Sequence, residues 1–287
     1  MEQKNFQDLN LNNSLLFSAA LEDKETCRLI LECILDCNIT SLEVHAEHNV
    51  LFNSDFKYIR LDVYGKDQLD ISYDLEMQNR NEGNLPLRSR YYQAELDLSS
   101  LKPGDNYDQL KPLYVIFICS FDPFGKQLYR YTFEMQCTER NFPLNDGVKR
   151  IFLNTKGTNY NEVSSALVSF LGYLEDSSDS YINKTNCVKL KKIHARVVTL
   201  KKNRNLKEKY MFFEEYLKQY EKDGFNRGFE RGMEQGLEEG LEQGLAQGYS
   251  EIFTLLKIMK ENGEEHLISR LSEDANFLKS KLEQYHI

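Results

Sequence analysis

The segment that most constrains the fold is PLYVIFICSF, residues 112–121, the most apolar run in the chain. Such a run is typical of a strand that is buried on both faces, in the middle of a sheet. Both faces of that sheet must then be covered by other elements, which predicts a layered fold.

Two kinds of hydrophobic periodicity indicate the strands and helices over the remainder of residues 13–155. Alternation with period two predicts strands over residues 41–52, 58–65, 69–78, 128–137 and 148–155. Apolar residues spaced by three and four predict helix over 13–37, where EDKET either breaks the helix or starts a second one, and over 85–101. We therefore expect an α/β (α+β) fold, with a mixed sheet flanked by helices and followed by a helical C-terminal region.

The strand over residues 69–78 has one apolar face and one polar face, which carries Ser72, Asp74, Glu76 and Gln78. A hairpin that turns near 65–69 would bring Asp62 opposite this region, and cross-strand partners have Cβ atoms about 5 Å apart. Two carboxylates at that distance repel unless a cation lies between them, and Mg²⁺ is held by one or two carboxylates with several waters. Asp62 and Glu76 are therefore a candidate metal site, and Gln78 is a neutral group that could orient an attacking water.

A second interpretation of this polar face remains open. Antiparallel strands normally present polar residues to solvent, so the spacing alone favours a solvated surface. Asp74 favours the solvated surface, because it adds a carboxylate that the metal site does not need. Acidic residues are depleted in strands, which favours the metal site.

Several segments together resemble a known family. RLDVYG at 60–65, YDLEMQ at 73–78, RSRYYQAELD at 88–97 and YVIFICSFDPFG at 114–125 are similar to the PD-(D/E)XK-type nucleases among bacterial putative transposases, also called recombination-promoting nucleases. The resemblance covers roughly residues 10–175. It implies a restriction-endonuclease-like core that cuts DNA with Mg²⁺, or with Mn²⁺.

The resemblance also implies roles for individual residues. Asp62 matches the aspartate of the motif and Glu76 its glutamate, whereas Gln78 stands where the wider superfamily usually has lysine. A lysine can polarise a nucleophilic water through its charge, but an amide can only form hydrogen bonds to it. Activity would then be slow or would depend on a second group. Asp23 is similar to a helix acid that some related nucleases use.

Candidate DNA contacts lie in two places. Arg88, Arg90 and Gln93 match a patch of the family that could hold a phosphate, for which arginine has suitable geometry. Residues 184–209 hold ten Lys and Arg against one acid, so Lys191, Lys192 and Arg196 could follow a DNA backbone. For both groups, a solvated helix face is the alternative interpretation.

Glycine recurs every fourth residue from Gly224 to Gly248, and an apolar residue follows each glycine. Glycine costs about 1 kcal/mol relative to alanine in a helix, so a helix with this repeat needs a compensating interaction. Close packing against a second helix along the glycines is one solution, which predicts a homo-oligomer formed through residues 224–248. A flexible tether and contact with another protein are the alternatives.

Bulk properties narrow the class of protein. The net charge of -9 does not favour indiscriminate nucleic-acid binding, although a local basic surface can still bind. The first residues do not resemble a signal peptide, no apolar run is long enough to span a membrane, and six cysteines form no C-x-x-C pair. We expect a soluble, cytoplasmic protein with reduced thiols.

We therefore expect a metal-dependent DNA endonuclease linked to recombination or a mobile element. The alternative is a catalytically decayed DNA-binding or assembly protein on a nuclease-like core. The expected parts are a nuclease core over 1–175, a basic helical extension over 176–222, and the glycine repeat with a terminal amphipathic helix over 223–287.

Overall fold

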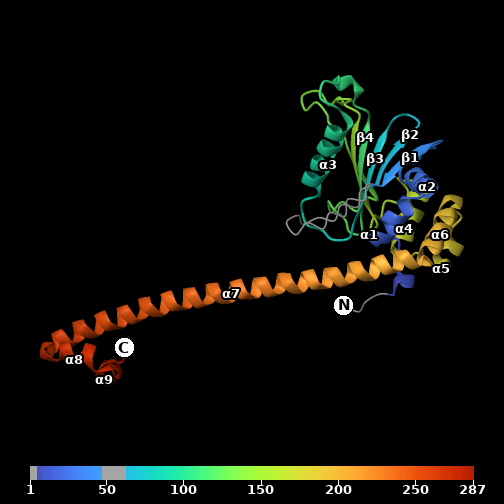
Figure 1. Cartoon of the computed structure of the whole chain (residues 1–287). Helices are drawn as coiled ribbons and strands as arrows, with labels where there is room; N and C mark the ends of the chain where they lie inside the picture. Colours follow the sequence, from blue (N-terminus) through green and yellow to red (C-terminus); the bar gives the residue numbers. More distant parts are fainter. Residues whose placement is uncertain (1–4, 47–62) are drawn as a thin grey trace. The chain divides into compact units, whose positions relative to one another are not determined.

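The computed structural model describes residues 5–46 and 63–287 (Figure 1). The chain divides into two compact units, Met1–Met211 and Phe212–Ile287. These units differ from the three expected parts because helices after residue 175 pack into the first unit. Among them, α6 (Val188–Lys201) buries Leu190, Ile193 and Val197 in the main core.

The first unit is built on one mixed sheet. Its strand order in the described residues is β1-β2-β3-β4-β6-β5. The strands β3–β4 and β4–β6 are parallel, and the other neighbours are antiparallel. This arrangement confirms the predicted mixed sheet. The strands are β1 (Leu42–Ala46), β2 (Val63–Asp67), β3 (Ser72–Gln78), β4 (Leu113–Cys119), β5 (Arg130–Phe133) and β6 (Val148–Asn154).

The central strand β4 is the apolar run that constrained the fold. Val115 and Phe117 point to one face of the sheet, Ile116 and Ile118 point to the other, and all four are buried. A strand in this position needs helices on both sides, because neither of its faces tolerates water. The prediction of a doubly buried central strand is confirmed.

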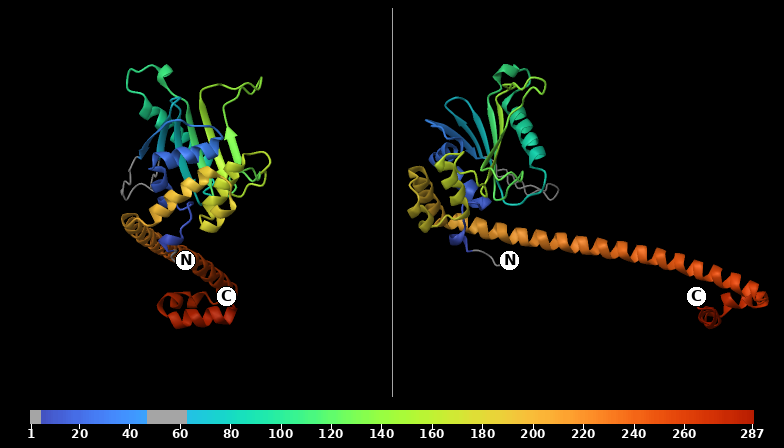
Figure 2. Two further views of the ribbon diagram at one scale, coloured as in Figure 1. Left: turned by 90° about the vertical axis from the view of Figure 1, so that its right-hand side faces the viewer. Right: turned by 180° about the vertical axis from the view of Figure 1, so that it is seen from behind.

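Helices cover both faces of the sheet (Figure 1, Figure 2). On one face, α1, α2, α4 and α6 enclose the main core, whereas α3 covers a smaller core on the other face. The helices of the described residues, besides short 3₁₀ turns, are α1 (Ser14–Leu21), α2 (Lys24–Leu35), α3 (Leu85–Ser100), α4 (Ser165–Glu175), α5 (Asp179–Lys184), α6, α7 (Arg204–Glu261), α8 (Ile268–Glu273) and α9 (Ala275–Tyr285).

The predicted hairpin forms between β2 and β3, but its turn comes later than expected. Gly65 lies within β2 and pairs with Tyr73. The turn instead follows Asp67, whose Oδ1 accepts hydrogen bonds from the N–H groups of Leu69 (2.9 Å) and Ile71 (3.0 Å). The Asp67 side chain thus adds to the backbone hydrogen bond from the Asp67 N–H to the Ile71 carbonyl (3.1 Å), a typical role of aspartate in turns.

The second unit contains most of α7, followed by α8 and α9. The glycine repeat is helical throughout. A Cβ added at any of these glycines would meet no heavy atom within 4 Å beyond the adjacent backbone of the same helix. The apolar residues that follow them are between 54% and 76% exposed; they are Phe225, Phe229, Met233, Leu237, Leu241, Leu245 and Tyr249.

Two further sequence expectations concern the chain as a whole. In the part of the chain that the structure describes, no helix combines the length and the apolarity needed to cross a membrane. The six cysteines all lie in described segments and have free thiols. Burial raises the pKa of Cys27, Cys33 and Cys119 to about 12, which makes these thiols poor nucleophiles.

Candidate functional site

The polar face of β3 points toward α3. Glu76 pairs in register with Phe117 and Gln78 with Cys119 on the parallel strand β4. Side chains paired in register lie on the same face of a sheet, and Phe117 and Cys119 belong to the core beneath α3. Asp74 is only 1% exposed and Glu76 only 8%. The interpretation of this row as a solvated strand face is therefore wrong.

Arg88 brings a positive charge to this row. It lies in the first turn of α3, and its Nη1 donates a hydrogen bond of 2.7 Å to Oε1 of Gln78. Its Nη2 donates to the Tyr92 hydroxyl at 3.1 Å, and the guanidinium carbon lies 5.5 Å from the ring centroids of both Tyr92 and Phe117. Two hydrogen bonds and two aromatic rings thus hold the guanidinium in one place.

Burial has the largest effect on the pKa values of Arg88 and Tyr92, and the charge of Glu76 also acts on both. Burial alone would lower the pKa of Arg88, but its hydrogen bond to Tyr92 and the negative charge of Glu76 raise it overall. Burial raises the pKa of Tyr92, and the charge of Glu76 adds to this effect. The negative charge of Glu76 thus favours the charged form of Arg88 and the neutral form of Tyr92.

The other α3 residues expected to contact DNA do not join this group. Arg90 is exposed. Gln93 faces β6, where its Oε1 accepts hydrogen bonds from Nη2 (2.6 Å) and Nε (3.2 Å) of Arg150. The structure therefore brings Arg88 to Gln78 and separates Arg90 and Gln93 from them, because helix residues share a face at spacings of three and four, whereas Arg90 and Gln93 lie two and five residues after Arg88.

The second carboxylate of the expected metal site, Asp62, lies outside the described residues. The β2–β3 pairing begins, on that side, with Val63 opposite Leu75. No group of three or more His, Cys, Asp or Glu side chains within residues 5–46 and 63–287 is arranged to hold a metal ion. Glu76 and Asp74 nevertheless supply the hard oxygen atoms that Mg²⁺ and Mn²⁺ prefer, so the chemistry of the described residues fits such an ion.

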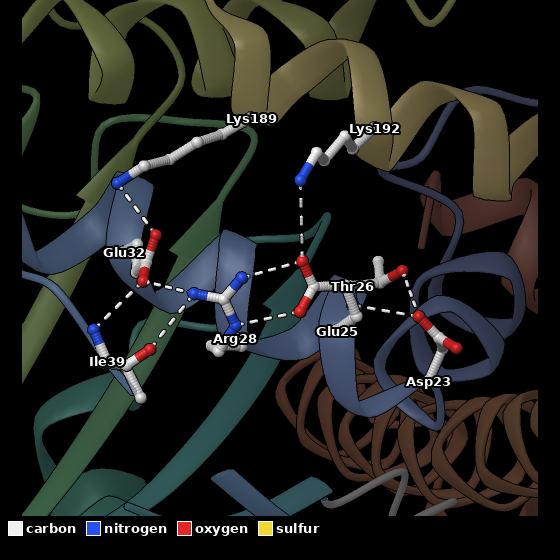
Figure 3. Close-up of polar contacts among 8 residues, drawn as sticks. All are labelled: Asp23, Glu25, Thr26, Arg28, Glu32, Ile39, Lys189 and Lys192. Atoms are coloured by element: carbon white, nitrogen blue, oxygen red, sulfur yellow. Dashed lines mark hydrogen bonds and ion pairs between the residues drawn. The ribbon is translucent and has the colours of Figure 1, made fainter. Parts of the chain in front are cut away.

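The basic residues of α6 lie in the layer on the opposite face of the sheet, where α6 packs against α2 (Figure 3). Lys192 lies 4.0 Å from a Glu25 carboxylate oxygen, and Lys191 is exposed. Arg196 is half-buried and its charge contributes to lowering the pKa of Asp23. The structure thus does not bring these three basic residues to Glu76.

Figure 3 also shows what the acids near α6 do. Asp23 caps α2, accepting hydrogen bonds from the backbone N–H (2.9 Å) and hydroxyl (2.6 Å) of Thr26. Glu32 is 3% exposed, and its carboxylate forms ion pairs with Nη1 of Arg28 (2.6 Å) and Nζ of Lys189 (2.9 Å). It also accepts a hydrogen bond from the Ile39 N–H (3.0 Å). These contacts join α2 to α6 and to the chain that follows α2. For Asp23, capping is the observed role, and a role in catalysis stays a prediction.

Sequence reasoning missed Tyr92 and Arg150. Tyr92 stacks on Phe117 with ring centroids 5.7 Å apart, and the i, i+4 spacing from Arg88 was a usable signal for their contact. Arg150 belongs to a strand more than fifty residues beyond its partner Gln93, and no local pattern points to that contact.

Comparison with known proteins places this arrangement in a family. A family model described as PD-(D/E)XK nuclease family transposase matches residues 14–224. No curated protein and no solved structure matches the chain. The matched span includes the entire described sheet, α3 and the group formed by Glu76, Gln78 and Arg88, and it is well over half of the chain. This confirms the resemblance and the restriction-endonuclease-like fold, and the chain therefore belongs to the PD-(D/E)XK nuclease family transposases.

Proposed function

We propose that this protein is a metal-dependent DNA endonuclease that hydrolyses phosphodiester bonds, in the service of recombination or a mobile element. The observation that carries the proposal is the polar row of β3 beneath α3, in which Glu76 is buried and Gln78 accepts a hydrogen bond from the guanidinium of Arg88. Burying such groups beneath a helix destabilises a fold unless they are compensated. These groups lie within the residues that the nuclease family model matches, and this supports a catalytic role for them.

Asp62 and Glu76 would hold Mg²⁺, for which Mn²⁺ can substitute. When bound, the ion lowers the pKa of a coordinated water and stabilises negative charge on a phosphate oxygen. Gln78 is oriented by Arg88 through Oε1 and by the Met77 carbonyl through Nε2 (3.2 Å). A carbonyl oxygen has a second lone pair, so Oε1 can also accept a hydrogen bond from the attacking water.

Arg88 supplies the positive charge that a motif lysine would supply. Lysine acts through a charged ammonium, which Gln78 lacks. The Arg88 guanidinium, 2.7 Å from Oε1 of Gln78, places a permanent charge at the same end of β3. Arg88 therefore acts as a positioning residue for the Gln78 amide and as a cation near the phosphate, and Arg90, Gln93, Lys191, Lys192 and Arg196 remain proposed DNA contacts.

Incubation with supercoiled plasmid in Mg²⁺, Mn²⁺ or chelator tests the proposal. Nicking is expected with either metal, and Asp62→Asn or Glu76→Gln should lower it by about a thousandfold, the size expected for losing a metal ligand or charge stabiliser. Glu43→Gln, at an exposed carboxylate on β1, is the control and should cut like the wild type. Cleavage that survives both site substitutions would reject the site.

The alternative function, a catalytically decayed DNA-binding or assembly protein, is motivated by Gln78 and by the net charge of -9. It predicts that purified protein shifts DNA in a gel but leaves it uncut under every divalent ion. Plasmid cleavage by the wild type that is lost in Glu76→Gln excludes this alternative.

We also propose that the protein forms homo-oligomers through residues 224–248, and that it acts in the cytoplasm. Apolar side chains more than half exposed recur there at every fourth residue, next to glycines around which the space is open. A second copy can approach closely along the glycines and cover these side chains, offsetting the roughly 1 kcal/mol that each glycine costs the helix.

Light scattering on the full chain tests the oligomer. The double substitution Leu237→Glu/Leu241→Glu should reduce the mass in solution to the 33.7 kDa of one chain. The control Gln235→Glu/Gln243→Glu adds the same charge at other positions of the repeat and should keep the wild-type mass. A wild type of 33.7 kDa would refute the proposal.

A further inference from the structure

A cavity of about 300 Å³ opens beside α3, on the face of the sheet that carries Glu76. Three aromatic rings form much of its wall. The Phe124 ring lies edge-on to those of Phe133 and Phe152, with centroids 5.1 Å away in each case, and Phe133 and Phe152 are 5.7 Å apart. The volume is at the lower end of the range for small-molecule sites, about 300–1,000 Å³.

A fixed set of polar groups lines the same cavity. Arg150 is held by Gln93 through Nε and Nη2, and within the described residues its hydrogen bonds go to Gln93 alone. Asp146 and Glu134 bring carboxylates to the lining; one oxygen of Asp146 accepts from the Val148 N–H, and Glu134 pairs with Lys149 at 3.0 Å. The cavity thus combines flat apolar walls with both hydrogen-bond donors and acceptors.

The sheet register sets the distance from the proposed cleavage site. Glu76, Phe117 and Phe152 lie side by side on β3, β4 and β6. Neighbouring strands are about 4.8 Å apart, so Phe152 is about 10 Å from Glu76 along the same face. That separation corresponds to about three stacked nucleotides of one DNA strand.

We infer that this cavity receives one nucleobase of the DNA strand, turned out of the helix within about three nucleotides of the bond at Glu76. The inference rests on the proposed function, because that function makes DNA the ligand. A base is flat enough to pack on the phenylalanine rings, and its edge carries acceptors for Arg150 and donors for a carboxylate. A purely apolar side chain would fill the space but would leave the guanidinium of Arg150 without a partner from the ligand.

Binding measurements with 2-aminopurine oligonucleotides test the inference without cleavage. The full chain with Glu76→Gln, its folding checked by thermal melting, is titrated with duplexes that contain a short unpaired bubble. The fluorescent base is moved through the bubble one position at a time. One position is expected to respond by stacking, and fully paired duplexes should show no such response.

Phe133→Ala in the same background should remove the position-specific signal and weaken bubble binding about tenfold, the size of losing one stacking contact. Arg150→Met should weaken it too. Phe142→Ala is the matched control, an exposed phenylalanine outside the cavity, and should behave like its parent.

An equal response at all positions, a signal that persists in Phe133→Ala, or no DNA binding overturns the inference. Absence of DNA binding would refute the nuclease proposal as well, whereas the other outcomes are separable from its failure. A wild-type protein that cuts plasmid but shows no position-specific signal retains its function and loses the base site. A wild-type protein that binds an unpaired base through Phe133 but never cuts retains the base site and loses the nuclease function.

Discussion

The two faces of the sheet bury different chemistry. On the face covered by α1, α2, α4 and α6, β3 and β4 present Tyr73, Leu75, Ile116 and Ile118 to a large apolar core. On the face covered by α3, β3 presents Asp74, Glu76 and Gln78, beside the Phe117 ring of β4. Residues next to each other in β3 thus enter two environments that differ in polarity and in packing.

This difference shows how the fold separates stability from chemistry. Several helices, α1, α2, α4 and α6 among them, close the first face, and burying that apolar surface supplies the main driving force for folding. Among the described residues, α3 is the helix that covers the second face (Figure 2). This face also holds the cavity beside Phe152 and the half-buried Arg88. Tight packing on one face allows the other to keep polar groups that cost stability.

The sharpest test of this comparison is on neighbouring residues of β3. Leu75→Ala should lower the free energy of unfolding by about 3 kcal/mol, because it leaves a void in the main core. The fraction of the Leu75→Ala variant that is folded should cleave plasmid at the wild-type rate. Glu76→Gln should instead lose cleavage and keep the wild-type free energy of unfolding. Denaturant unfolding and plasmid cleavage measure the two effects.

Leu98→Ala is the control for that substitution, since Leu98 is 79% exposed on α3 and should change stability little. If Leu75→Ala abolished cleavage in folded protein, the separation between the faces would be refuted.

The second prediction concerns Glu32, the α2 carboxylate that forms an ion pair with Lys189 of α6 on the face of the main core. Burial alone would raise the pKa of Glu32, but hydrogen bonds from Lys189 and the Ile39 N–H and the charge of Arg28 lower it overall. A lowered pKa in the folded state means that the carboxylate stabilises the fold above its ordinary pKa of 4.5 and that this contribution is lost as the pH falls below it. Glu32→Gln should cost about 2 kcal/mol at pH 7, and the cost should shrink toward acid pH.

Thermal melting across pH measures this effect. Glu25→Gln is the matched control, because Glu25 binds the same Arg28 from an exposed position and should contribute less than about 1 kcal/mol. If Glu32→Gln lowered the stability of the fold by the same amount at pH 3.5 and at pH 7, the charge of Glu32 would not be the cause.

On the face covered by α3, the substitution Gln78→Lys tests the role of Arg88. The new ammonium would lie beside the guanidinium that now contacts Oε1 of Gln78, and two like charges should cost about 1 kcal/mol of stability. The exchange Gln78→Lys/Arg88→Gln restores one cation and one amide, so it should recover both stability and cleavage relative to the single substitutions. A double-mutant cycle measures this coupling, and additive effects would contradict it.

The smallest expected effect is at Asp97 on α3. Burial raises its pKa, the charge of Asp146 adds to this, and the hydrogen bond from Gln93 opposes it. A raised pKa means that the ionised carboxylate is unfavourable in the folded state, so the wild type gains stability as the pH falls through that pKa. Asp97→Asn should raise stability at pH 7 by less than about 0.5 kcal/mol, with the difference vanishing in acid.

Melting curves at several pH values check this, with Asp108→Asn at an exposed position as the control. Lower stability of Asp97→Asn at pH 7 would mean that the α3 face does not penalise this charge.

The sequence by itself determined the elements and their order. The apolar run became the central strand β4, period-two segments became strands, and the segment over 13–37 became two helices with Asp23 as the cap of the second. The helices and strands depend on residues a few positions apart, so local periodicity suffices to predict them. The cap formed by Asp23 was not predicted and comes from the structure. The turn after β2 comes slightly later than the expected turn near 65–69, because the Asp67 side chain makes its hydrogen bonds.

Only the tertiary structure decided what covers each face of β3. Alternation shows that the strand has a polar side, but it does not show whether water or α3 lies against that side. The contacts of Arg88 with Gln78 and of Arg150 with Gln93 join separate segments, and the cavity exists only between them. Burial is a property of packed segments rather than of any one stretch, and it turned an ordinary polar strand face into a candidate site.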